Sequence, residues 1–378
     1  MSSRFDSSRF GLNLPDYPWD RLTEFRDRAA QHPDGVCDLS IGTPVDPTPQ
    51  VIQSALAAAG DAHGYPTTAG TTELREAIAW WYQNWHGVTL DPAAEVLPTV
   101  GSKELVAWLP TLLGLRQAGL EVACPSAAYP TYEMGATIAG VDCRRLDAAD
   151  VAAGASLDGI GLLWINTPGN PTGEVLDTDT LAEVVRRTRE SGVVLASDEC
   201  YGLLNWESES PAPSILNVTG GDHHGVLSVY SMSKQSNLAG YRAAFVTGDR
   251  DLIGDLTKSR KHAGMIVPFP VQAAMIAGLR DTAHVTEQKE RYRARRDLLR
   301  SGLEDYGFRI DHSSAGLYLW SSADINCWDS LSGLADIGII AGPGEFYGEA
   351  ATDHVRIALT ASDERIEAAA RRLHAAAE

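Results

Sequence analysis

The sequence has few cysteines and no long apolar run. Its five cysteines are scattered, their number is odd, and none stands in a Cys-x-x-Cys spacing. This favours reduced thiols in a cytoplasmic protein over a disulfide framework or a zinc site. No apolar run approaches the roughly 18 residues of a membrane span, and the N-terminal stretch lacks the apolar core of a signal peptide. We therefore expect a cytoplasmic protein with no membrane partner and no bound metal.

Positive charge is also scarce. The chain has 31 Lys and Arg residues against 50 Asp and Glu residues, which gives a net charge of −19 and a sequence pI near 4.9. Such a surface repels phosphate backbones, so we expect no nucleic-acid partner. An acidic small-molecule substrate is still compatible with this charge, because a few local arginines can outweigh a distant field.

What the sequence does contain is a series of short apolar runs that alternate with amphipathic segments. The runs are EVLPTV, EVAC, VDCRRL, GLLWIN, VVLASD, VLSVYS and AAFVTG. Several are apolar on both faces, as strands between two helix layers are. Segments such as Leu181–Ser191 have a helical pattern instead. The alternation predicts an α/β domain with a mainly parallel sheet.

The pattern changes after about Pro268. A long, highly charged helical segment leads into a short α+β region. There Gly316–Ala323 and His354–Thr360 read as strands, and Ser362–Ala377 reads as a closing helix.

We predict three parts from these changes. Residues 1–40 form an N-terminal arm with a helix around Trp19–Gln31, residues 41–265 form the large domain, and residues 266–378 form a smaller α+β C-terminal domain. The arm is expected to pack with the small domain.

A lysine stands where such a sheet binds its ligands. The sequence Ser231-Met-Ser-Lys234 directly follows the strand VLSVY, and the carboxyl ends of parallel strands form the ligand crevice. There Lys234 could form an imine with an aldehyde and later act as a base. Ser231 and the nearby Arg242 suit a phosphate group. Taken alone, the motif would more often be a surface lysine at a strand end.

Two further strands end in polar residues. The segment NTPGNPTG has two prolines and two glycines, which predict a fixed loop that holds Asn170 rigidly. An ordinary turn into a helix is the alternative. Asp198 ends the strand VVLASD, where a buried carboxylate needs a partner such as a pyridinium N–H. The alternative is a cap of the following helix.

Three more elements are compatible with the same site. Gly101-Ser102-Lys103 lies between a strand and a helix, whose N-terminal N–H groups could bind phosphate. Tyr129 could stack on a flat ring, or could be an ordinary core tyrosine. Arg356, in an alternating strand, could bind a carboxylate with both arms of its guanidinium, or could be a solvated strand residue.

Together these motifs resemble the class I and II aminotransferases of pyridoxal 5′-phosphate (PLP) fold type I. The matching positions are Gly42-x-Pro44, Tyr65, Gly70, Leu74-Arg75, Gly101-Ser102, Tyr129, Asn170-Pro-Thr-Gly173, Asp198-Glu-x-Tyr201, Ser231-x-Ser233-Lys234, Arg242 and Arg356. The resemblance implies a large domain with a mainly parallel seven-stranded sheet, a smaller C-terminal domain, and PLP as cofactor.

The resemblance also implies the residues of the site. The cofactor-binding positions are Tyr65, Gly101, Ser102, Lys103, Tyr129, Asn170, Asp198, Tyr201, Ser231, Ser233, Lys234 and Arg242. Lys234 is similar to the Schiff-base lysine and proton shuttle, and Asp198 to the partner of the pyridine nitrogen. Tyr201 and Asn170 are similar to donors to the ring's phenolic oxygen. Lys234, Asp198 and Tyr201 form the implied catalytic set.

For the substrate, the resemblance implies contacts from Gly42 and Asn170, and a clamp on the α-carboxylate from Arg356. It implies that Tyr65 reaches a phosphate across a subunit interface, and therefore a homodimer with composite active sites.

Within the family, the sequence is most similar to bacterial N-succinyldiaminopimelate aminotransferases, which act in lysine and peptidoglycan-precursor synthesis. The segments that carry this likeness are LPDYPWDRL, DLSIGTPVDPTP, GYPTTAGTTELREAI, VGSKELVAWLP and PSAAYPTYEMGA. The likeness implies glutamate and 2-oxoglutarate as one substrate pair. Because both substrates would be acidic, a second cation is expected, with Lys103 as the first candidate and Lys258, Arg260 and Lys261 as weaker ones.

Three alternatives remain at this point. They are an aminotransferase specific for aspartate or aromatic amino acids, a PLP-dependent β-lyase, and a non-catalytic sensor on the same fold. The chain departs from the family at Ala244, where the family often has glycine.

Overall fold

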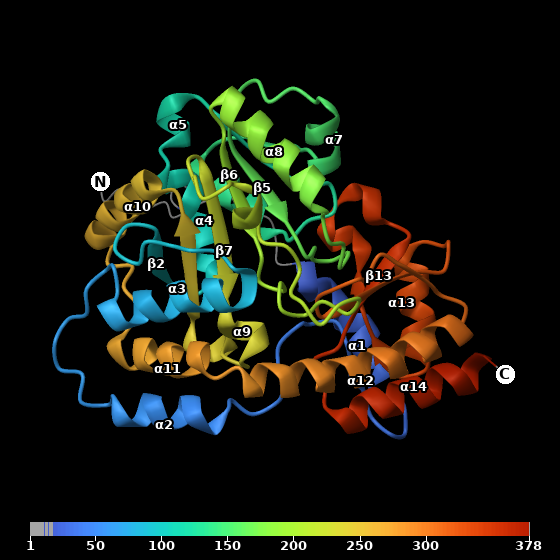
Figure 1. Cartoon of the computed structure of the whole chain (residues 1–378). Helices are drawn as coiled ribbons and strands as arrows, with labels where there is room; N and C mark the ends of the chain where they lie inside the picture. Colours follow the sequence, from blue (N-terminus) through green and yellow to red (C-terminus); the bar gives the residue numbers. More distant parts are fainter. Residues whose placement is uncertain (1–10, 12–13, 15–17, 378) are drawn as a thin grey trace, which may run out of the picture.

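The computed structural model describes Gly11, Leu14 and residues 18–377. Its centre is a large sheet (Figure 1). The sheet has seven strands in the order β2-β8-β7-β6-β5-β3-β4. The strands are β2 (Val96–Val100), β3 (Glu121–Cys124), β4 (Cys143–Arg145), β5 (Ile160–Asn166), β6 (Val194–Asp198), β7 (Val226–Ser231) and β8 (Ala243–Gly248). Each comes from one of the seven predicted apolar runs. β8 alone runs opposite to the other six strands, so the predicted, mainly parallel sheet is confirmed.

Helices cover both faces of this sheet. They are α2 (Gln50–Ala58), α3 (Thr72–His86), α4 (Ser102–Leu112), α5 (Leu115–Ala118), α6 (Thr131–Ala139), α7 (Ala148–Ala153), α8 (Thr178–Ser191), α9 (Met232–Gln235), α10 (Arg250–Ala263) and α11 (Phe269–Arg280), with 3-10 turns at Ile215–Val218 and Ala239–Tyr241. One core packs α3, α8 and α11 against the sheet, and a second core packs α4, α6 and α10 against it. This is why the strands are apolar on both faces.

Side-chain caps set where several of these helices begin. Thr71 accepts a hydrogen bond from the Leu74 N–H at 3.1 Å at the start of α3. Asp177 accepts one from the Thr180 N–H at 2.7 Å at the start of α8. Such caps satisfy N–H groups that the first helical turn leaves unpaired, so the short connections to the strands are well defined.

The remaining elements pack around a third core. A four-stranded antiparallel sheet has the order β12-β13-β10-β9, and β1 pairs with β11 in parallel. The elements are η2 (Pro18–Leu22), α1 (Thr23–Ala29), β1 (Cys37–Asp38), α12 (Ala283–Asp305), β9 (Arg309–Asp311), β10 (Tyr318–Ser322), α13 (Cys327–Asp336), β11 (Ile339–Ile340), β12 (Gly342–Pro343), two 3-10 turns (Gly344–Tyr347 and Glu349–Ala351), β13 (His354–Ala358) and α14 (Asp363–Ala377). The strands and closing helix predicted for this region are therefore present.

The N-terminal segment crosses to this third core. Leu22 and Ala29 are buried in it together with Tyr292 of α12 and Val355 of β13. Figure 1 shows α1, in blue, beside the orange and red C-terminal elements. The exact limits of the arm and of the two domains stay a prediction. No helix in the described part of the chain is long and apolar enough to cross a membrane.

Candidate active site

A cavity of about 720 Å³ lies at the carboxyl end of the large sheet, a size typical of small-molecule sites. Most of the site residues predicted from the sequence line it: Gly42, Ser102, Lys103, Tyr129, Asn170, Asp198, Tyr201, Ser231, Ser233, Lys234, Arg242 and Arg356. They come from strand ends and loops spread over more than 300 positions. The fold therefore brings them together, as expected because the carboxyl ends of parallel strands form the ligand crevice.

Lys234 lies in this cavity on the short helix α9, directly after β7. Its Nζ donates a hydrogen bond to the backbone carbonyl of Gly42. Burial lowers the pKa of the Lys234 ammonium, because removal from water disfavours its charged form. Burial therefore makes the neutral amine, which is the nucleophilic form of lysine, easier to reach than in water.

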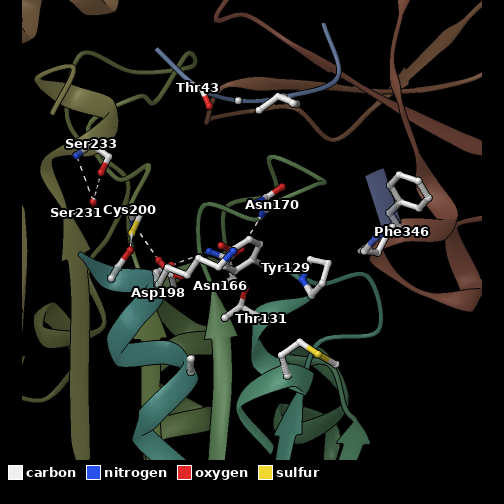
Figure 2. A pocket seen from close by; sticks show the side chains of 18 of the residues that line it. Thr43, Tyr129, Thr131, Asn166, Asn170, Asp198, Cys200, Ser231, Ser233 and Phe346 are labelled. Atoms are coloured by element: carbon white, nitrogen blue, oxygen red, sulfur yellow. Dashed lines mark hydrogen bonds between the residues drawn. The ribbon is translucent and has the colours of Figure 1, made fainter. Parts of the chain in front are cut away.

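Asp198 ends β6 and is buried. Its Oδ2 accepts a hydrogen bond from the Tyr132 hydroxyl at 2.9 Å. Its Oδ1 accepts one from the N–H of Cys200, its neighbour in Figure 2, at 3.2 Å. Burial raises the pKa of Asp198, although these two donors oppose the shift. A cation placed beside this carboxylate would be strongly favoured, since the charge is otherwise expensive to bury.

The donors predicted for a phosphate group also line the cavity. Figure 2 shows Ser231 and Ser233 side by side, where the Ser231 hydroxyl donates to the Ser233 Oγ at 2.9 Å. Arg242 is held in the left-handed region with φ 57°, and its Nη1 donates to the Ala239 carbonyl at 2.8 Å. Ser102 is the first residue of α4, so it adds the N-terminus of an eleven-residue helix.

Gly101 keeps room for the Arg242 guanidinium. Its φ of 78° and ψ of 153° suit glycine almost alone. A Cβ at this position would lie 2.2 Å from Nη2 of Arg242, which is far inside contact distance. The turn therefore favours glycine at 101, and a larger residue there would push the Arg242 guanidinium aside.

Arg356 is buried on β13 and is held by the predicted loop around Asn170. Its Nη1 donates to the Asn170 Oδ1 at 2.9 Å, and its Nη2 donates to the Ser40 carbonyl at 2.7 Å. Its guanidinium lies 3.9 Å from the centre of the Tyr318 ring. The Arg356 Nε has no hydrogen-bond partner among the described residues, so this buried cation retains an unused donor.

Two tyrosines from different parts of the chain meet beside this arginine. The hydroxyls of Tyr201 and Tyr318 lie 3.3 Å apart. Burial by itself would raise the pKa of Tyr318, but the neighbouring cations Arg356 and Lys234 lower it overall. The Tyr318 ring also lies against Gly42, since a Cβ on that glycine would be 2.0 Å from the Tyr318 hydroxyl.

Sequence reasoning missed several residues of the site. Tyr132 lies three positions after Tyr129, and this proximity in the sequence was the only indication that Tyr132 is close to the site. Tyr318 occurs in the predicted strand GLYLW without any motif of its own. Arg21 and Glu345 also line the cavity, and nothing in the local sequence marks them.

Other predicted residues lie elsewhere in the described chain. Tyr65 is fully exposed and does not line the cavity. Arg260 is buried and forms two hydrogen bonds with the Glu104 carboxylate, at 2.9 and 2.8 Å, so it is committed to a structural ion pair. Lys258 pairs with a neighbouring aspartate in solvent, and Lys261 does not line the cavity either. The three weaker candidates for a second cation are therefore absent from the cavity lining.

The donor set fits a pyridine aldehyde that carries a phosphate. One cavity is surrounded by a lysine amine, a buried carboxylate, a helix N-terminus, two kinds of phosphate donor (hydroxyls and an arginine) and the aromatic ring of Tyr129. Asp198 supplies the anion that a protonated pyridine nitrogen requires, and Lys234 supplies the amine that an aldehyde requires. Fold and site together define a PLP-dependent enzyme of fold type I.

Comparison with known proteins narrows this class. The family described as "Aminotransferase class I and II" matches residues 34–373. The 4-dedimethylamino-4-oxo-anhydrotetracycline transaminase OxyQ of Streptomyces rimosus is 51% identical, over 95% of this chain and 99% of its own. Probable aminotransferase Rv1178 of Mycobacterium tuberculosis is 51% identical, over 96% of this chain and 85% of its own. The solved structure of N-succinyldiaminopimelate aminotransferase from Mycobacterium tuberculosis superposes with a TM-score of 0.83 at 25% identity, over 96% of this chain and 100% of that chain.

This chain therefore belongs to the class I and II aminotransferases. It uses PLP, as the members of this family do, and it is an aminotransferase.

Proposed function

We propose that this enzyme is an N-succinyl-LL-2,6-diaminopimelate:2-oxoglutarate aminotransferase of the lysine and diaminopimelate pathway. The observation that carries the proposal is a pair of arginines, Arg356 and Arg21, that line one cavity. Both substrate pairs of this reaction have two or more carboxylates, and arginine forks bind carboxylates well. The likeness to the solved N-succinyldiaminopimelate aminotransferase supports the same substrate class.

When bound, PLP supplies an electrophilic aldehyde and a ring that withdraws electrons from the carbon next to the amino group. In this proposal the Lys234 amine would hold the cofactor through its aldehyde. Once the substrate is bound, the Lys234 Nζ would be the base that accepts the proton from the substrate's α-carbon and the acid that gives it back. The lowered pKa of Lys234 suits this task, because the neutral amine is the base.

Asp198 is proposed to hold a proton on the pyridine nitrogen by a charged hydrogen bond. Tyr132 and the Cys200 N–H orient its carboxylate, so the anion is fixed in position before the cofactor arrives. Tyr201 and Asn170 are proposed to donate toward the ring's phenolic oxygen, and Tyr129 to stack on the ring.

The phosphate end is proposed to bind Ser102, Ser231, Ser233 and Arg242, with Gly101 and Lys103 beside them. The α-carboxylate of the substrate would bind Arg356, next to Gly42, and take up the Nε donor that the described residues leave unused.

We further propose a homodimer with composite active sites. Tyr65 is a fully exposed aromatic side chain on a loop, it does not line the cavity of its own chain, and it is therefore available to a second subunit. In the dimer the partner subunit's Tyr65 would reach the phosphate end of the cavity.

A second candidate function is transfer of an amino group to a polycyclic ketone, because the chain is 51% identical to OxyQ over nearly the whole length of both proteins. The aromatic residues Trp19 and Phe346 in the outer cavity are compatible with such an acceptor.

An absorbance experiment separates these functions. Glutamate should convert the purified holoenzyme from the aldehyde to the amine form of the cofactor, and acceptors are then added one at a time. N-succinyl-2-amino-6-oxopimelate should restore the aldehyde form faster than oxaloacetate, phenylpyruvate or a 4-oxo-anhydrotetracycline. Faster recovery with any of those would refute the proposed specificity, and pyruvate release from cystathionine would indicate a β-lyase. Lys234→Ala should abolish both half-reactions.

A further inference from the structure

Arg21, on the N-terminal turn η2, faces the cavity at an outer aromatic cluster, which we define as Trp19, Trp328 and Phe346. The Arg21 guanidinium lies 4.4 Å from the Trp328 ring centre and 5.9 Å from the Phe346 ring centre. Trp19 packs on Phe346 with ring centres 5.1 Å apart. Rings that cover a guanidinium face fix its plane and leave its edge free for hydrogen bonding.

The edge of Arg21 already binds a carboxylate. Its Nη1 donates to the Glu345 Oε1 at 2.8 Å, and the Trp328 Nε1 donates to the Glu345 Oε2 at 2.5 Å. The Trp328 and Arg21 hydrogen bonds lower the pKa of Glu345, so it stays ionised at neutral pH. The side chains of Arg21 and Glu345 are 54% and 36% exposed, and both line the cavity. Arg21 is therefore within reach of a ligand in the cavity.

This cluster is at the end of the cavity away from the proposed phosphate site. Figure 2 shows Phe346 on one side and Ser231 and Ser233 on the other, with Tyr129 and Asn170 between them. A substrate whose α-carboxylate is bound by Arg356 near Asn170 can therefore extend its side chain toward Phe346.

Tyr347 connects the two arginines. The Arg356 guanidinium lies 4.9 Å from the Tyr347 ring centre, and the Tyr347 ring contacts Trp19 edge-on with centres 6.3 Å apart. Arg21 and Arg356 therefore both line the cavity, and the packed rings of Phe346, Trp19 and Tyr347 link them. A substrate with a carboxylate at each end has one arginine available for each.

We propose that Arg21 is a specificity-determining residue that binds the distal carboxylate of the amino donor and of the oxo-acid acceptor. The inference rests on the proposed function and adds the residue that binds the distal end of the substrate. Lys103 also lines the cavity, but its ammonium lies 6.0 Å from the Tyr129 ring centre and offers no planar fork. The rival explanation is that the Arg21–Glu345 pair only fastens the arm.

The test compares glutamate with glutamine, which has the same shape and a neutral distal end. In Arg21→Gln holoenzyme the ratio of kcat/KM for glutamate to kcat/KM for glutamine should fall by about 10- to 100-fold, the value of one charge-assisted hydrogen bond. The loss should appear in KM for glutamate rather than in kcat, because Arg21 is proposed to contact only the distal end of the substrate. Calorimetry should show the same selective loss for glutarate relative to glutaramate. An unchanged ratio would overturn the proposal.

Arg28→Gln is the matched control. Arg28 lies in the same arm, and its Nη1 donates to the Ser332 Oγ at 2.6 Å, so it also ties the arm down, but it does not line the cavity. Arg28→Gln should leave the glutamate-to-glutamine ratio unchanged. Equal losses in the two variants would assign Arg21 a fastening role and refute the proposal. If the ratio depends on Arg21 but N-succinylated substrates are not turned over, the inference stands and the proposed pathway fails.

Discussion

Glu199, next to Asp198, is a buried carboxyl group whose ionisation should control how stability depends on pH. Its side chain is 3% exposed. Its Oε1 accepts from the Ile215 N–H at 2.7 Å, and its Oε2 accepts from the Ser228 hydroxyl at 2.8 Å. Burial raises the pKa of Glu199 from 4.5 to about 7, because these donors only partly replace water.

The sign of the effect follows from this direction. The pKa of Glu199 is higher in the folded chain than in the unfolded chain, so folding favours its protonated form. The contribution of protonated Glu199 to the free energy of unfolding is fully present below pH 4.5 and is lost as the pH rises through about 7. The difference between the two pKa values corresponds to about 3 kcal/mol of unfolding free energy, since one pKa unit corresponds to about 1.4 kcal/mol.

The perturbation is Glu199→Gln, which keeps an oxygen acceptor for the Ile215 N–H and removes the ionisation. The melting temperature of the holoenzyme is measured from pH 4.5 to pH 8 at one scan rate. With about 2.1 cal/mol/K of unfolding entropy per residue over 378 residues, 3 kcal/mol corresponds to about 4 °C. The variant should gain about 4 °C relative to wild type between pH 4.5 and pH 8.

An exposed glutamate supplies the control. Glu367 lies on α14, with its side chain 57% exposed. Glu367→Gln should follow the wild-type profile at every pH. Parallel profiles for Glu199→Gln and wild type would refute the reasoning, because they would mean that Glu199 has the same pKa in both states.

Two further predictions concern the site. Gly101→Ala should weaken PLP binding at least about tenfold in a fluorescence titration, since its Cβ would displace Arg242. Gly87→Ala is the control, because Gly87 also has a positive φ, 67°, but no atom lies within 4 Å of the added Cβ. This variant should lose only about 1 kcal/mol of stability and keep the PLP affinity of wild type. Equal PLP affinities in the two variants would contradict the role of Gly101. Tyr132→Phe removes the donor to Asp198 and should lower kcat about tenfold with little change in KM. A kcat equal to that of wild type would show that this hydrogen bond does not support the carboxylate.

Much of this architecture was readable in the sequence. The strands β5, β7 and β8 are short apolar runs between helical patterns, and their burial on both faces follows from that local composition. Lys234 and Asp198 directly follow or end such strands, so the rule that ligands bind at the carboxyl ends of parallel strands brings them together before any coordinates are known.

Other parts of the site depend on contacts between distant segments. Tyr132 approaches Asp198 across 66 positions, and Arg21 meets Glu345 across 324 positions. Arg260 is a charged residue of an amphipathic helix in the sequence, and only the tertiary fold, which packs α10 against β2 and β8, buries it beside Glu104.

Hydrophobic periodicity and strand ends are local properties, so the sequence alone determined the sheet and the strand-end residues that line the cavity. The partners of those residues, and the far wall where Arg21 lies, were decided by how the arm and the C-terminal sheet pack against the large sheet. That packing is set by the burial of many side chains at once, and no short segment carries it.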